Sequence, residues 1–137
     1  MTKERLRNYQ KIKREREQLE HQLAEIETLL YYPKIPQMSD MPRGGSKEAN
    51  PQEALAVHHI ELQQLYKDKI KELAKEQLAI EKAIEPLGST ARQLMRYRYL
   101  DGLKWEEVCV KLNYSWSQTH LLHAQILRLM ADQEVEV

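Results

Sequence analysis

The sequence holds one cysteine, four glycines and no phenylalanine among its 137 residues. A single cysteine excludes an intramolecular disulfide framework and a multi-cysteine zinc site. Scarce glycine, with abundant Glu, Lys, Gln, Leu and Ala, favours an all-α fold over a β-sandwich or barrel. No apolar run approaches the roughly 18 residues that span a bilayer, and the first residues lack the apolar stretch of a secretory signal. We therefore expect an all-α, cytoplasmic protein with no membrane partner.

Charge is balanced overall but unevenly distributed. Lys plus Arg number 21 and so do Asp plus Glu, which gives a formal net charge of zero. This balance excludes a uniformly basic coat for nucleic acid, although it leaves room for a locally basic face. Residues 1–16 are strongly basic. We interpret that stretch first as a solvated helix surface with internal ion pairs, and keep nucleic-acid contact as the alternative.

Two long helices are predicted, over about residues 2–30 and 51–85, with a proline- and glycine-containing loop at 31–50 between them. Seam residues recur in steps of three and four along both helices, which predicts a long antiparallel helical hairpin over residues 1–85. The first seam is Tyr9, Ile12, Arg16, Leu19, Leu23, Ile26 and Leu30, and the second is Leu55, His59, Leu62, Tyr66, Ile70, Leu73, Ile80 and Ile84.

The apolar stripes of this hairpin are too large to stay exposed on a monomer. They include Leu19, Leu23, Ile26, Leu62, Leu73 and Ile80. We therefore expect the hairpin to make the chain a homo-oligomer, a dimer or larger, or to contact a partner.

Residues 86–131 predict three shorter helices, followed by an acidic tail at 132–137. Thr90 and Gln93 have the spacing of a capping box that opens the first of them. The second, 105–112, is expected to end at Asn113, because Asn tolerates the left-handed backbone conformation.

A further capping box, Ser115 with Gln118, opens the third helix. A short helix, a turn of three or four residues and a helix that starts with small polar residues are typical of a helix-turn-helix. A generic three-helix bundle is the alternative.

Several short motifs in this block follow one another in a known order. They are Arg98-Tyr99-Leu100-Asp101-Gly102, Glu106-Glu107-Val108-Cys109, Leu112-Asn113 and Ser115. In this order they resemble region 4 of bacterial sigma factors. The whole chain, with SDMPRGGS at 39–46 between two long helices, further resembles small regulators from phages and prophages of Gram-positive bacteria, similar to the ArpU and RinA type activators of late genes.

That resemblance implies a three-helix, sigma-region-4-like helix-turn-helix domain at 86–131 whose third helix enters the major groove of duplex DNA. It also implies host RNA polymerase as a further partner. The recognition helix departs from the sigma pattern, because it begins with uncharged side chains where several Arg or Lys are usual. We expect DNA contacts from Arg92, Arg96, Lys104, Lys111, Ser115, Trp116, Ser117, Gln118 and His120.

These DNA contacts divide into two kinds. The Arg and Lys side chains are expected to attract phosphate. Gln118 is the best candidate for base reading, because its amide can bond both the N6 and N7 edges of adenine. The alternative for Gln118 is occupation in the capping box with Ser115.

Catalytic chemistry has little support in the sequence. His58-His59 and the pair His120 and His123 lack a matching cysteine or carboxylate cluster for a metal. Cys109 is expected on a buried helix face without a spaced His and acid partner. PRGGS lacks the lysine spacing of a phosphate-binding loop. We expect no enzymatic activity, no metal and no cofactor.

The favoured function is sequence-specific regulation of phage or prophage transcription. Two alternatives stay open. One is the small subunit of a phage packaging terminase, which also joins a helix-turn-helix to helical assembly segments. The other is an interaction module that no longer binds DNA and contacts RNA polymerase or another regulator.

Overall fold

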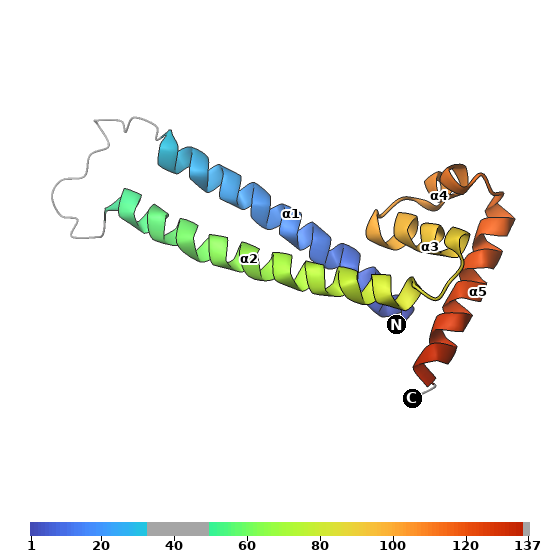
Figure 1. The fold of residues 1–137 in the computed structure, drawn as a ribbon. Helices are drawn as coiled ribbons and strands as arrows, with labels where there is room; N and C mark the ends of the chain where they lie inside the picture. The colour runs from blue at the N-terminus through green and yellow to red at the C-terminus, as the bar shows by residue number, and fades with distance from the viewer. Residues whose placement is uncertain (33–49, 136–137) are drawn as a thin grey trace. The chain divides into compact units, whose positions relative to one another are not determined.

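The structure, a computed structural model, describes residues 1–32 and 50–135 (Figure 1). This part of the chain is all-α, as predicted. Its helices are α1 (Lys3–Tyr31), α2 (Pro51–Ile84), α3 (Ser89–Met95), α4 (Trp105–Leu112) and α5 (Trp116–Val135), and the π-helical segment η2 (Arg96–Leu100) extends α3. The loop predicted at 31–50, including SDMPRGGS, lies almost entirely outside the described residues. No helix in the described ranges is both long and apolar enough to cross a membrane.

The chain packs as two compact units, and both long helices contribute to each. Unit 1 comprises Met1–Arg14 and Lys71–Val137, and unit 2 comprises Glu15–Ile70. Within each unit α1 and α2 run antiparallel, which confirms the predicted pair of long helices. The domain boundary predicted between residues 85 and 86 runs through unit 1.

In unit 2 the two helices meet along an unbroken heptad seam. The steps of three and four run from Leu62 through Tyr66 to Lys69, all half-buried. The Nζ of Lys69 lies 2.8 Å from Oε2 of Glu15 on α1. Ile70 is exposed, so its predicted place in the seam was wrong. A charged side chain holds the seam position because it finds an opposite charge across the helix pair.

The apolar stripes that were expected to drive self-association are largely covered by contacts within the chain. Leu23 and Ile80 are buried, and Leu19, Ile26, Leu62 and Leu73 are half-buried. The inference that these stripes need a second chain to cover them was therefore wrong. Oligomerisation stays a prediction, without that support.

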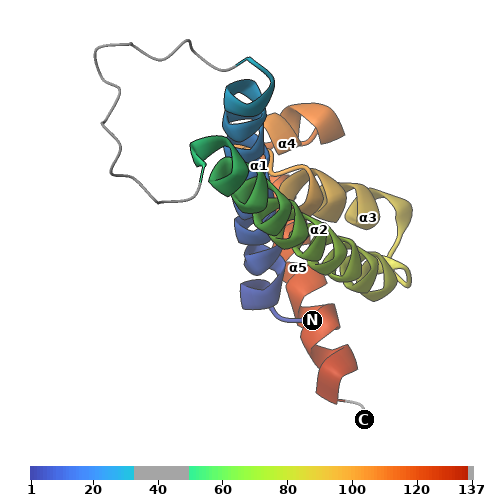
Figure 2. The same ribbon diagram turned by 90° about the vertical axis from the view of Figure 1, so that its left-hand side faces the viewer.

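Unit 1 has one hydrophobic core to which all its helices contribute. Its buried members are Leu6, Tyr9, Ile80, Ile84, Leu87, Leu94, Met95, Tyr99, Leu100, Val108, Ile126 and Met130. Leu6 of α1 is fully buried there. Burial of a side chain of that size contributes about 1.5–3 kcal/mol. Figure 2 shows the first turns of α1 beside α5, so the C-terminal helices share their core with the ends of the long helices.

Three local predictions in this unit need correction. Helix α3 begins at Ser89 after an extended Gly88 with no side-chain cap, so the Thr90 and Gln93 capping box was wrong. On α4 the buried side chain is Val108, whereas Cys109 is only half-buried. Helix α5 continues to Val135, so the predicted acidic tail is helical over 132–135.

A π-helical turn and a sharp bend connect α3 to α4. The N–H of Asp101 donates to the carbonyl of Arg96, five residues back, at 2.8 Å. Gly102 follows with φ 73°, a left-handed conformation that favours glycine. Gln10 of α1 packs closely against Gly102 and donates from Nε2 to the carbonyl of Tyr99 at 2.7 Å. The bend therefore docks on α1.

Candidate nucleic-acid interface

A tight turn joins α4 to α5. Asn113 is left-handed, with φ 58°, and the N–H of Tyr114 donates to the carbonyl of Cys109 at 3.1 Å. Ser115 Oγ then accepts from the N–H of Gln118 at 3.1 Å, and Gln118 Oε1 accepts from the N–H of Ser115 at 2.9 Å. The predicted stop at Asn113 and the predicted capping box are both confirmed.

The same capping box occupies the side chain that was the best candidate for base reading. Bidentate recognition of adenine needs both the oxygen and the nitrogen of the Gln118 amide. The oxygen is already bonded to the Ser115 N–H, so Gln118 reads adenine this way only if the cap opens. Trp116 and Ser117 are exposed beside it, and they present the free surface of the first turn of α5. Gln118 therefore positions this turn.

A row of stacked rings supports that turn. The ring centroid of His120 lies 4.5 Å from that of Trp105 and 4.3 Å from that of Trp116. The guanidinium carbon of Arg98 lies over the Trp105 ring, 4.6 Å from its centroid. His120 Nε2 is covered and has no hydrogen-bond partner within the described part of the chain. His120 therefore holds Trp116 in place more than it presents a polar group to a ligand.

His123 is buried in unit 1 and bonded to a tyrosine. Its Nε2 lies 2.6 Å from the hydroxyl oxygen of Tyr99. Burial first, and then the charges of Lys3, His120, Arg98 and Arg7 in that order, lower the pKa of His123 from 6.5 to about 4. At neutral pH the uncharged imidazole shares this hydrogen bond with the Tyr99 hydroxyl. Burial also raises the pKa of Tyr99.

The absence of a metal stays an expectation, and both members of the pair His120 and His123 make other contacts. His123 Nε2 is engaged by Tyr99, and His120 is stacked between two tryptophans. Among residues 1–32 and 50–132, no group of three or more His, Cys, Asp or Glu side chains is arranged to hold a metal ion.

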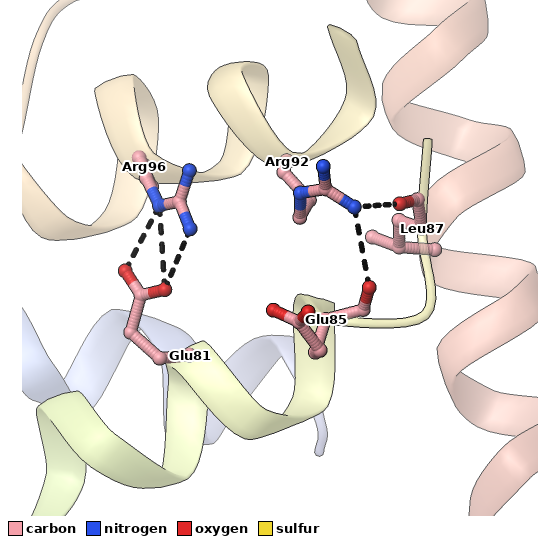
Figure 3. Close-up of polar contacts among 5 residues, drawn as sticks. All are labelled: Glu81, Glu85, Leu87, Arg92 and Arg96. Carbon is pink, nitrogen blue, oxygen red and sulfur yellow. Dashed lines mark hydrogen bonds and ion pairs between the residues drawn. The ribbon is translucent and has the colours of Figure 1, made fainter. Parts of the chain in front are cut away.

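Arg92 and Arg96, two of the expected phosphate contacts, bind the end of α2 instead (Figure 3). Arg96 contacts Glu81 in a bidentate manner, with Nε 3.0 Å from Oε1 and Nη2 2.8 Å from Oε2. Arg92 Nη1 donates to the carbonyls of Glu85, at 3.3 Å, and Leu87, at 2.5 Å. The Arg96 hydrogen bonds lower the pKa of Glu81. A guanidinium already paired with a carboxylate attracts phosphate weakly, so this geometry argues against the expected role.

Arg96→Gln should weaken the attachment of α3 to α2 and lower the melting temperature, while the salt dependence of DNA binding stays unchanged. Lys111→Gln should leave the melting temperature unchanged and reduce the salt dependence of DNA binding, because Lys111 is exposed in the last turn of α4. Loss of one phosphate contact lowers the slope of log K against log salt by about 0.9. Thermal denaturation and fluorescence anisotropy over a salt series measure the two effects. Equal slope changes in both variants would restore Arg96 as a phosphate contact.

The expected contacts Lys104 and Lys111 lie at the two ends of α4, and both are exposed. The backbone N–H of Lys104 donates to Oε1 of Glu107 at 3.0 Å, which leaves the Lys104 ammonium out of the cap. These two lysines thus remain able to attract phosphate, and together with Ser115, Trp116 and Ser117 they form the exposed part of the predicted site.

A basic groove in unit 1 brings part of the basic stretch 1–16, for which nucleic-acid contact was the alternative, next to Arg98 and Trp105, and sequence reasoning missed this link. We call this groove the basic groove. It has a volume of about 480 Å³ and is lined by Lys3, Arg7, Gln10, Lys11, Arg14, Arg98, Tyr99, Gly102 and Trp105. A signal was present, because Lys3, Arg7, Lys11 and Arg14 recur in steps of four, four and three. That spacing places them on one face of a helix.

Comparison of the chain with known protein families, with curated proteins and with solved structures found no match. What the site does is therefore inferred from its own residues and geometry.

Proposed function

We propose that this chain is a sequence-specific, duplex-DNA-binding transcriptional regulator of phage or prophage genes. Helices α3, α4 and α5 would form its sigma-region-4-like helix-turn-helix. The main support is the connection from α4 to α5: an eight-residue helix, a left-handed Asn113, and a capped helix whose first turn is exposed. A short helix and tight turn of this kind present the next helix to the major groove. The phage context comes from the motif resemblance alone.

Each exposed residue has a distinct role in this proposal. Trp116 and Ser117 project from the first turn of α5, where recognition helices contact base edges. An apolar ring such as Trp116 suits the methyl group of thymine. Lys104 and Lys111 supply phosphate contacts, which fix orientation and carry no sequence information. Gln118 and His120 hold the reading turn in shape.

Selection from a random DNA pool tests the proposal. The full chain should retain fragments that share a short motif. The double variant Trp116→Ala with Ser117→Ala should relax the preference at one or two base pairs, which corresponds to roughly 1–3 kcal/mol per lost base contact. Leu129→Ala is the matched control, because Leu129 is an exposed apolar residue of α5, 53% accessible, far along the helix from the reading turn. An unchanged motif in the double variant would show that α5 is not the reader.

One observation favours a second candidate, an interaction module that contacts RNA polymerase or another regulator. Val110, Tyr114 and Trp116 are exposed apolar side chains around the turn, and the first turn of α5 holds no cationic residue. Exposed apolar residues of this kind suit a protein partner. Absence of any enriched DNA motif for the full chain would make this the leading candidate.

A further inference from the structure

The basic groove gathers five cationic side chains in unit 1. Lys3, Arg7, Lys11 and Arg14 come from one face of α1, and Arg98 comes from η2. At about 1.5 Å per residue, the stripe on α1 extends roughly 16 Å. A straight stripe of this length is long enough to contact more than one successive phosphate of a DNA strand.

Within the described part of the chain, these cations are not neutralised by carboxylates. Among residues 1–32 and 50–132, no carboxylate lies within ion-pair distance of the five side chains that line the groove. Other cations of α1 are paired: Arg5 Nε lies 3.0 Å from Oε2 of Glu76, and Arg16 pairs with Glu20 at 3.9 Å. Helix α1 therefore carries two kinds of cation: those paired with carboxylates, and the stripe of unpaired cations that lines the groove.

The groove is suited to phosphate more than to bases. The Trp105 ring in the groove already has contacts within the chain: it stacks against Arg98 and against the imidazoles of His120 and His123. Binding of unstacked bases needs free aromatic faces. The Tyr99 hydroxyl is likewise bonded to His123. What the groove offers to a ligand is positive charge along a helix, which a phosphodiester backbone complements.

The groove also lies close to the reading turn of α5. The ring row passes from Arg98 at the groove through Trp105 and His120 to Trp116. Lys3 and Arg7 are near enough to His123 of α5 to lower its pKa. One DNA duplex can thus contact both features of unit 1.

We propose that the α1 cations of the basic groove hold the phosphate backbone of the duplex that α5 reads, while Arg98, which donates from Nη1 to the carbonyl of Leu103 at 2.9 Å, adds positive charge beside them. This inference rests on the proposed function, and it assigns a sequence-independent contact to a helix outside the helix-turn-helix. It also accounts for a recognition helix whose first turn holds no cationic residue, because the phosphate attraction that this turn lacks is supplied by α1.

The test compares two double variants of the full chain that lose the same charge. Arg7→Gln with Lys11→Gln removes two groove cations. Lys71→Gln with Lys75→Gln removes two exposed lysines of α2 in unit 1, outside the groove. Binding to a duplex of about 30 base pairs is measured by fluorescence anisotropy over a salt series, with thermal denaturation as the check on folding. The selection experiment described above is repeated on both variants.

The groove variant should bind all duplexes roughly 10- to 30-fold more weakly at about 0.15 M salt, and its salt slope should fall by about two units. Its preferred motif should not change, and the α2 variant should bind like the natural chain. Equal behaviour of the two variants, with an enriched motif still present, would overturn the groove assignment and leave the proposed function standing. Failure of the natural chain to bind any duplex at low salt would overturn both proposals. Both would also be overturned if the groove variant lost affinity for RNA but not for duplex DNA.

Discussion

Deletion of residues 1–14 should abolish cooperative folding of unit 1. These residues supply Leu6, Tyr9 and Ile12, which are at most 5% exposed. Loss of one such buried side chain typically costs about 2–5 kcal/mol, and three together are comparable to the roughly 5–15 kcal/mol that keeps a whole domain folded. The deletion also removes Gln10, which bonds the carbonyl of Tyr99. Circular dichroism on heating should show no sharp transition.

A fragment that starts at the predicted domain boundary, residues 86–137, should fail in the same way. It lacks Ile80 and Ile84 of α2 as well as α1, and both isoleucines are fully buried. A cooperative transition in this fragment would contradict the shared core and support an autonomous C-terminal domain.

Replacement of residues 15–70 by a short loop is the matched control, because it removes more of the chain but leaves unit 1 intact. Glu15 Oε2 and Lys69 Nζ are 2.8 Å apart, so the turn of α1 at one cut end faces the turn of α2 at the other. A flexible linker of about six residues spans such a gap. This shortened chain should unfold cooperatively, and it should keep DNA binding because both the groove and α5 are retained.

Local signals explain why the helix boundaries could be predicted. Asn50 Oδ1 accepts the N–H of Gln52 at 2.8 Å and caps α2, which begins at Pro51. Asn113 ends α4 in the left-handed conformation. Such signals act within a few residues, so one sequence is enough to read them. Lys69 shows the limit, because a charged residue in a seam is recognised only when its partner, Glu15, is known.

The site was harder to predict because its residues are set by long-range packing. Arg96 reads as a free cation in the sequence, but Glu81 of α2 neutralises it. Arg7 and Arg98 are far apart in sequence, and they line one groove only because α1 docks on the bend after α3. The helical spacing of the α1 cations was visible, but the element they face was not.

Acidification from pH 7 to pH 5 should reduce the free energy of unfolding by about 2 kcal/mol through His123 alone. In the folded chain the pKa of His123 is lowered from 6.5 to about 4. Between these two values the unfolded chain binds more protons than the folded chain, so stability falls as pH falls. This contribution is complete above about pH 6.5 and is lost by about pH 4. The pKa of Glu81 is lowered from 4.5, so the stability that Glu81 contributes is lost only as pH falls below about 4.5, outside the range from pH 7 to pH 5.

Urea denaturation at pH 7, 6 and 5 measures this contribution, with two variants for comparison. His123→Leu should be less stable at pH 7, because the Tyr99 hydroxyl loses its partner, but its stability should depend much less on pH. His21→Gln removes an exposed histidine of α1 in unit 2, 75% accessible at the side chain, and should keep the full pH dependence. If His123→Leu and the natural chain lose the same free energy between pH 7 and pH 5, the buried imidazole is not the group that titrates. A natural chain that gains stability on acidification would reverse the sign and exclude a neutral His123 in the folded state.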